Sequence, residues 1–171
     1  LRKYRLEYDD KYLILTKIGV EIEKYPAVFN HLKKYHENLE KRWDKGNYWY
    51  ELRACDYYDE FEEPKIVYPD IAKESRIVYD LEKTYFNNTT YFIPTKDKWL
   101  TGILNSKMVF YFYKHNSTVI GNADKGGRLR WFTQDVKKIP IPELHEEIKS
   151  KLEELIDLII GLNRNLLNIK N

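Results

Sequence analysis

The segment Pro64-Lys65-Ile66-Val67-Tyr68-Pro69-Asp70 decides the fold class. Its centre, Ile66-Val67-Tyr68, is a short apolar run of β-rich residues. Pro64 opens the run and Pro69-Asp70 closes it. Proline is seldom found inside a central strand, so the two prolines mark the ends of the predicted element. The segment therefore predicts a short apolar strand near the middle of the chain.

Other β-rich runs lie on both sides of this strand. The predicted strands are 4–8, 12–16, 66–68, 76–80, 90–93 and 128–132. The first two are separated by Asp9-Asp10, which predicts a hairpin, and Asn87-Asn88 marks a turn before 90–93. A polar loop with three glycines, from Gly121 to Gly127, precedes the last strand.

Three segments have helical periodicity. Residues 26–43 and 97 to about 114 repeat apolar side chains every three or four positions. The third segment is a heptad seam of seven apolar residues: Ile148, Leu152, Leu155, Ile159, Leu162, Leu166 and Ile169. Further apolar residues beside the seam predict packing against more than one neighbour. A terminal helix that lies on its own domain is the alternative.

These elements indicate an α/β (α+β) fold with a mixed, mostly antiparallel sheet, two packed helices and a C-terminal heptad helix. The extended connector Lys138-Ile139-Pro140-Ile141-Pro142 separates the last strand from that helix. We therefore expect a recognition domain over 1–142 and a C-terminal packing or spacer helix over 143–171.

Composition excludes several classes of protein. The chain has 171 residues, 43% of them hydrophobic and 33% charged, and its net charge is +2. These values argue against disorder, and no apolar run approaches the roughly 20 residues of a membrane span. The single cysteine, Cys55, excludes an internal disulfide and predicts a reducing, cytoplasmic setting. The start at Leu1, with neither Met nor a signal pattern, suggests a cut into a longer polypeptide.

Motifs for catalysis are missing from the sequence. An adenine methyltransferase needs a Pro-Pro-aromatic loop and a glycine-rich turn, whereas this chain has no adjacent prolines. A metal-dependent nuclease needs an acid after proline and a nearby Asp/Glu-x-Lys triplet. Pro69-Asp70 is present, but the next triplets, 135–137 and 147–149, are distant. The four histidines lack metal-ligand spacing, so we expect no catalytic or metal-binding residue.

An ordered set of blocks resembles the TaqI-like C-terminal specificity domain of type IIG restriction–modification enzymes. The blocks are 25–32, 39–42, 49–53, 64–72, 88–93, 100–107, 127–131 and 139–142. The resemblance implies an α/β target-recognition domain joined to an adenine methyltransferase, often with a nuclease in the same polypeptide. It also implies that the parent enzyme uses S-adenosylmethionine and Mg²⁺, with neither held by this fragment. The helix after residue 142 is similar to the spacer helices of type I specificity subunits.

DNA recognition needs cations and backbone donors for phosphates, and polar side chains on loops for base edges. The best candidate is the stretch 122–131, with Lys125, Gly127, Arg128 and Arg130. In a strand, Arg128 and Arg130 share one face while Leu129 and Trp131 face the core. We favour Arg128 as a base reader, because it is nearer the glycine loop. A solvated charged face is the alternative.

The remaining candidates are weaker. Polar residues leave the predicted helix at 114–118, and basic residues flank the central strand or lie near the N-terminus. These candidates are Lys114, Asn116, Ser117, Lys73, Arg76 and Arg5.

The sequence thus predicts binding of specific double-stranded DNA, which the domain would present to an attached methyltransferase or endonuclease. The rival hypothesis is an assembly module that docks or self-associates through the C-terminal helix and binds no DNA. A catalytic fragment is a third reading, which the missing motifs disfavour.

Overall fold

A computed structural model describes residues 1–7, 11–122 and 126–168, with side-chain surroundings as far as residue 166. The chain forms two compact units: unit 1 comprises Leu1–Tyr8 and Glu60–Asn171, and unit 2 comprises Asp9–Asp59. This division differs from the predicted boundary at residue 142, which stays a prediction about function. Among the described residues, no helix has both the length and the apolar content needed to cross a membrane.

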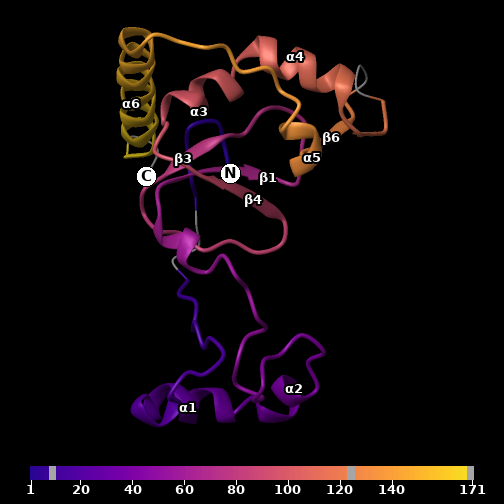
Figure 1. Cartoon of the computed structure of the whole chain (residues 1–171), viewed down its shortest axis with the longest axis vertical. Coiled ribbons are helices and arrows are strands. Elements are labelled where there is room, and N and C mark those ends of the chain that lie inside the picture. The colour runs from indigo at the N-terminus through magenta and orange to yellow at the C-terminus, as the bar shows by residue number, and fades with distance from the viewer. Residues whose placement is uncertain (8–10, 123–125, 169–171) are drawn as a thin grey trace. The chain divides into compact units, whose positions relative to one another are not determined.

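Apart from the long helix α6, the elements of both units are short (Figure 1). In chain order they are η1 (Ile22–Lys24), α1 (Pro26–Lys33), α2 (His36–Glu40), η2 (Asp59–Glu62), β1 (Lys65–Pro69), β2 (Ile71–Ala72), β3 (Val78–Asp80), β4 (Thr90–Pro94), α3 (Trp99–Leu104), α4 (Lys107–Asn116), β5 (Val119–Ile120), β6 (Arg128–Arg130), α5 (Thr133–Val136) and α6 (Glu146–Asn168). The predicted α/β class, with antiparallel strands and a long C-terminal helix, is confirmed.

The strands of unit 1 form two three-stranded sheets, where the sequence predicted one. Their orders are β3-β1-β4 and β2-β6-β5, and each described pairing is antiparallel. The chain passes from one sheet to the other at Asp70, between β1 and β2. The Asp70 amide donates to the Thr89 carbonyl at 2.9 Å, and the Asp70 carbonyl accepts from the Trp131 amide at 2.7 Å. Asp70 therefore links the two sheets through its backbone.

One core serves both sheets and two helices. It contains Ile66, Tyr68, Ala72, Ile77, Leu104, Val109, Tyr113, Leu129, Trp131 and Ile139. The α3–α4 pair lies on one side of the β3-β1-β4 sheet (Figure 1) and supplies Leu104, Val109 and Tyr113. The rings of Tyr113 and Trp131 stack with centroids 4.1 Å apart. This contact fixes the second sheet against α4.

The predicted helix from 97 to about 114 is two helices, because the backbone becomes extended at Ser106, directly after Asn105. The side-chain amide of Asn105 donates to the Ile77 carbonyl at 2.8 Å, and its oxygen accepts from the Ile77 amide at 3.1 Å. Ser106 then caps α4, since its hydroxyl accepts from the Val109 amide at 3.1 Å. At the break between α3 and α4, the two hydrogen bonds of Asn105 join this helix pair to the segment before β3.

A buried ion pair joins the strands of the first sheet. Lys65 on β1 and Asp80 on β3 are register partners, and their charged atoms lie 2.9 Å apart with both side chains fully buried. The Lys65 ammonium also donates to the Phe61 carbonyl at 2.7 Å. The Asp80 carboxylate accepts from the amides of Glu82 and Thr84. Both charges are thus paired and hydrogen-bonded, as burial demands.

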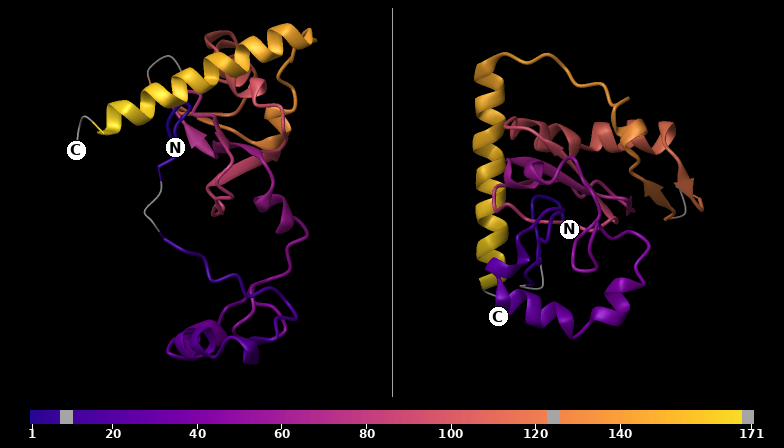
Figure 2. Two further views of the ribbon diagram at one scale, coloured as in Figure 1. Left: turned by 90° about the vertical axis from the view of Figure 1, so that its left-hand side faces the viewer. Right: turned by 60° about the horizontal axis from the view of Figure 1, so that its bottom comes forward.

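The C-terminal helix α6 forms as predicted but buries a different face. It packs against α3 at one edge of unit 1 (Figure 2). Ile156 is 2% exposed, and its Cδ1 lies 3.3 Å from where a Cβ on Gly102 would be. Five residues of the heptad seam are exposed instead: Ile148, Leu155, Ile159, Leu162 and Leu166. Ile169 lies outside the described residues.

Unit 2 contradicts two sequence predictions. Residues 26–43 form two short helices, α1 and α2, separated by Lys34 and Tyr35. Residues 12–16 form no strand, so the predicted hairpin is wrong. Thr16 pairs with a distant segment instead: its carbonyl accepts from the Leu52 amide at 2.8 Å, and its hydroxyl donates to the Tyr50 carbonyl at 2.6 Å. In unit 1, Tyr4 has a φ of 57°, which is incompatible with the strand predicted over 4–8.

Candidate nucleic-acid interface

The β2-β6-β5 sheet has one face that combines arginines with aliphatic side chains. Ile71 is the register partner of Arg130, and Ile120 is the partner of Arg128. Opposite residues of an antiparallel pair point to the same side. These four residues therefore share a face, which we call the outer face. Arg128, Ile71 and Ile120 are exposed and Arg130 is half-buried.

The opposite side of the same strand is buried, as the alternation predicted. Leu129 and Trp131 are each 1% exposed, which confirms that they face the core. The Tyr113 hydroxyl donates to the Arg130 carbonyl at 2.8 Å, and the Arg130 amide donates to the Thr118 carbonyl at 3.0 Å. The backbone that carries both arginines is therefore held by α4, through Tyr113, and by the segment before β5, through Thr118.

Burial raises the pKa of the Tyr113 hydroxyl, with a smaller contribution from the Asp135 carboxylate. The folded state thus favours the protonated, donating form. The resulting stability is fully present below about pH 10, the ordinary tyrosine pKa, and is lost as pH rises from there toward the raised folded-state value.

Replacing Tyr113 with phenylalanine should lower the free energy of unfolding by about 0.5–1.5 kcal/mol at neutral pH, since one buried hydrogen bond is lost. The gap between wild type and variant should narrow above about pH 10, where the wild type alone loses the contribution of this hydroxyl. Urea titrations of both proteins at pH 7 and pH 11 measure this. A gap that is constant with pH would contradict it.

Glycines shape the loop between β5 and β6. Gly121 and Gly126 have φ values of 85° and 80°, which other residues rarely adopt. The Gly127 amide donates to the Asn122 carbonyl at 2.7 Å, and a Cβ on Gly127 would lie 2.6 Å from that oxygen. The lack of a side chain at Gly127 therefore allows a close approach to the Asn122 backbone within the loop itself. Lys125 lies outside the described residues.

The two arginines of the outer face differ in their surroundings. The Arg130 guanidinium lies 3.4 Å from Asp70 Oδ2 and 4.9 Å from the centre of the Phe132 ring. Asp70 Oδ1 is buried and has no hydrogen-bond partner among the described residues. Arg128 is exposed and makes no ion pair in the part of the chain that the structure describes. Arg130 is thus oriented and compensated by Asp70, whereas no acid among the described residues pairs with Arg128.

The predicted residues at the end of α4 are less favourably placed. Asn116 is exposed, but its amide donates back to the Phe112 carbonyl at 2.8 Å. The Ser117 hydroxyl is buried and has no hydrogen-bond partner among the residues described, which counts against a base contact from it. Lys114 is half-buried and near β5 in sequence.

The last three predicted residues are Lys73, Arg76 and Arg5, and only Lys73 lies beside the outer face. Lys73 follows β2 one position after the Ala72–Leu129 pair, so the register puts it level with Arg128, and it is exposed. Arg76 pairs with Glu74 at 3.4 Å, and Arg5 pairs with Glu7. The register thus brings Lys73 alongside the outer face, while Arg76 and Arg5 are engaged elsewhere.

Sequence analysis missed the residues that complete the outer face. The side chains of Ile71, Ile120 and Phe132 carry no charge, so the search for cations and polar groups did not identify them. Ile71 comes to lie beside Arg130 through the pairing of β2 with β6, which are far apart in the sequence, and Ile120 lies beside Arg128 through the pairing of β5 with β6. Asp70 had a visible signal, since it follows Pro69 in one of the blocks. It was weighed as a nuclease residue and not as a partner for arginine.

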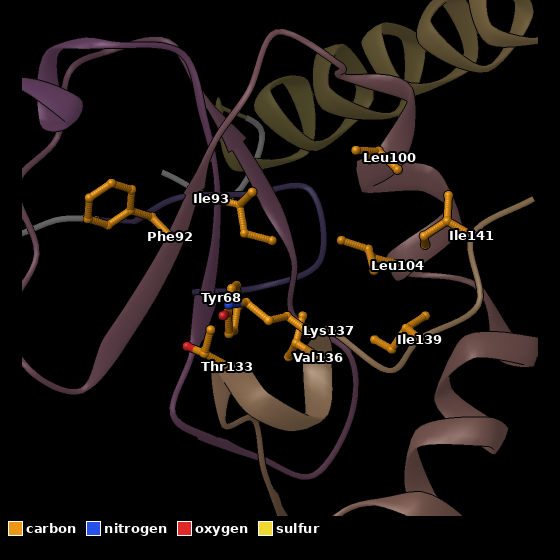
Figure 3. A pocket seen from close by; sticks show the side chains of 10 residues that line it. All are labelled: Tyr68, Phe92, Ile93, Leu100, Leu104, Thr133, Val136, Lys137, Ile139 and Ile141. Carbon is orange, nitrogen blue, oxygen red and sulfur yellow. The ribbon is translucent and has the colours of Figure 1, made fainter. Parts of the chain in front are cut away.

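A cavity of about 260 Å³ lies apart from this face, under α3 and α5 (Figure 3). Apolar side chains line most of it, including Phe92, Ile93 and Leu100. The polar groups at the cavity are those of Thr133 and Lys137, besides the hydroxyl of the core residue Tyr68. Thr133 interacts with this hydroxyl. The cavity thus offers few partners for the edge of a base, and we do not assign it to recognition.

Comparison with known proteins identifies a family, and the relatives found include two methyltransferases. The model of the TaqI-like C-terminal specificity domain matches residues 1–141. The type II methyltransferase M.BanIII of Aneurinibacillus aneurinilyticus is 28% identical over 94% of this chain and 29% of its own length. The type II methyltransferase M.MjaIV of Methanocaldococcus jannaschii is 23% identical over 86% of this chain and 52% of its own length. The chain thus spans about half or less of these relatives.

Proposed function

We propose, from the premise that this chain belongs to the family of TaqI-like C-terminal specificity domains, that it binds a specific duplex DNA sequence through the outer face of the β2-β6-β5 sheet. The family and the methyltransferase relatives support a target-recognition role in restriction–modification. The observation that carries the proposal is the shared face of Arg128 and Arg130, with Ile71 and Ile120 beside them.

The surroundings of the two arginines support different tasks for them. A base contact gains from a guanidinium that is already oriented, and Asp70 and Phe132 orient Arg130. A phosphate contact gains from net positive charge, which Arg128 has and the Arg130–Asp70 pair lacks. We therefore assign base reading to Arg130 and phosphate anchoring to Arg128, the reverse of the preference from sequence. The isoleucines offer apolar contact to thymine methyl groups.

Replacing Arg130 with alanine should cost about 1–3 kcal/mol on the preferred duplex and relax discrimination at one base position. Replacing Arg128 with alanine should weaken preferred and scrambled duplexes equally, and make the dependence of log affinity on log salt shallower by about one unit. The measurement is a salt titration of affinity for each protein. The preferred duplex is first selected from a randomised pool with the wild type.

Lys96→Ala is a matched control, because Lys96 is exposed and belongs to neither the outer face nor α4. It should leave selectivity unchanged. Wild-type affinity in both arginine variants, on both duplexes and at every salt concentration, would remove the outer face from the binding site.

The parent protein is proposed to be a site-specific adenine methyltransferase, in which other domains bind S-adenosylmethionine and, for a nuclease activity, Mg²⁺. The two relatives support this proposal through their names as type II methyltransferases. The role of this chain is then to hold the target site for the attached catalytic domain.

The chain by itself should neither methylate nor cleave DNA, because its sequence lacks the motifs for either reaction. Incubation with duplex DNA, labelled methyl donor and Mg²⁺ tests this directly. Methyl transfer or cleavage above a buffer control would refute the assignment.

An assembly role remains the second candidate, and the exposed seam of α6 favours it. The two functions are separable. An assembly module should show a concentration-dependent mass by light scattering without selective DNA binding.

A further inference from the structure

Unit 2 contains a hollow that the outer face does not use. It measures about 590 Å³ and lies where α1 meets α2. Aromatic rings, lysines and one acid line it, among them Phe29, His36, Trp49, Lys33, Lys34 and Glu37. An aromatic wall beside ammonium groups suits a ligand with both a planar or ring-shaped apolar part and negative charge.

Contacts within unit 2 hold the aromatic wall in place. The Trp49 ring centroid lies 4.7 Å from that of His36 and 5.6 Å from that of Phe29. The Arg42 guanidinium donates to the Trp49 carbonyl at 3.0 Å and to the Glu51 carbonyl at 2.9 Å. The buried Glu51 carboxylate in turn accepts from the amides of Asn47 and Tyr48. The wall is therefore formed before any ligand arrives.

Charge is distributed unevenly along unit 2. Residues 24–45 contain six lysines and arginines against three acids, whereas the rest of 9–59 contains three against seven. The helical segment is thus the positive part of a unit that is almost neutral. Lys33 and Lys34 are exposed and form no ion pair in the part of the chain that the structure describes. Their charges are available to a partner.

We propose that this hollow is a second DNA contact, which binds the sugar–phosphate backbone of the duplex independently of sequence. The proposal rests on the function proposed above. Lys33 and Lys34 hold phosphate oxygens, and the rings of Trp49 and Phe29 pack against deoxyribose. Because both units belong to one chain, this contact raises the effective concentration of the outer face at the DNA. Glu37 at the same hollow opposes one of the two positive charges and limits the affinity for random DNA.

The test replaces both lysines with glutamine in the whole chain. Lys33→Gln/Lys34→Gln should make the salt dependence shallower by about two units, since about 0.9 counterions are released for each phosphate neutralised. Affinity should fall by the same factor on preferred and scrambled duplexes. The matched control is Lys96→Gln/Lys151→Gln, which removes two exposed lysines of unit 1 and should leave the salt dependence unchanged.

Glu37→Gln should have the opposite effect. Removal of this carboxylate should strengthen binding to both duplexes and steepen the salt dependence, whereas a merely structural role for Glu37 predicts no gain.

An unchanged salt dependence in the double lysine variant, while Arg130→Ala still lowers selectivity, would overturn this inference and leave the proposed function intact. A loss confined to the preferred duplex would also overturn it, because the hollow would then read bases. Failure of the wild type to bind any duplex would refute both proposals together.

Discussion

Replacing Lys65 with methionine should lower the free energy of unfolding of unit 1 by about 3–5 kcal/mol, the range for breaking a buried ion pair from one side. The variant leaves the Asp80 carboxylate in a fully buried site without its cation. The amides of Glu82 and Thr84 still donate to it, but they do not balance its charge. Urea titration of the purified chain measures the loss.

A second substitution separates charge from packing. Lys65→Met/Asp80→Asn removes both charges and should recover a large part of the lost stability, since the remaining amide is far cheaper to bury than a carboxylate. A double variant no more stable than Lys65→Met would show that methionine fails at this position for reasons of shape. Strong coupling between the two sites in a double-mutant cycle is the expected result.

Replacing Ile156 with alanine should cost about 2–5 kcal/mol, the range for truncating a buried isoleucine. Its side chain fills the contact between α6 and α3, where Gly102 leaves space for it. Two hydrogen bonds also join these helices. Asp157 accepts one from the Lys98 side chain, and Glu153 accepts one from the Trp99 amide. The loss appears in a urea titration, with detachment of α6 as the first step.

Leu162→Ala is the matched control, because Leu162 lies on the same helix but is 54% exposed. Its stability cost in the monomer should be about 0.5 kcal/mol or less, as for most surface substitutions. The variant Leu155→Lys/Leu162→Lys, which charges the seam, should leave a monomeric chain equally stable. A large loss from the charged variant, together with a drop in mass by light scattering, would instead show that the seam joins copies of the chain.

The strands were the most predictable part of the fold. Each predicted strand in unit 1 from 66 onward overlaps an observed one, because short β-rich runs bounded by proline, asparagine or glycine carry their own limits. Their pairing was not predictable from local pattern. Asp70 moves the chain from one sheet to another through bonds to Thr89 and Trp131, and neither partner is near it in sequence.

The helices show why periodicity overestimates length. The 97–114 pattern continues through Asn105, yet that side chain forms two hydrogen bonds with Ile77, 28 residues away. Ser106 was a usable signal, since serine is a preferred N-cap. The predicted hairpin failed for a similar reason, because Thr16 bonds to Tyr50 and Leu52. On α6 the helix forms, but most of the predicted seam is exposed, and Ile156, which lies outside the seam, makes the buried contact.

The candidate site was predicted in its charged residues and missed in their context. Alternation placed Arg128 and Arg130 on one face and Trp131 in the core, which the burial pattern bears out. The different roles that we assign to the two arginines depend on Asp70, which reaches Arg130 only after the sheets form.

The spacing of the two arginines along β6 matches the spacing of nucleotides along B-DNA. An extended strand advances about 3.4 Å per residue, and B-DNA advances about 3.4 Å per nucleotide along each strand. Arg128 and Arg130, two residues apart on β6, are therefore separated along the strand by about the rise of two base pairs. If β6 lies along a groove, the phosphate that Arg128 holds and the base pair that Arg130 reads would lie about two nucleotide steps apart. Leu129 lies between the two arginines and points into the core, so β6 would offer no side chain to the step between them.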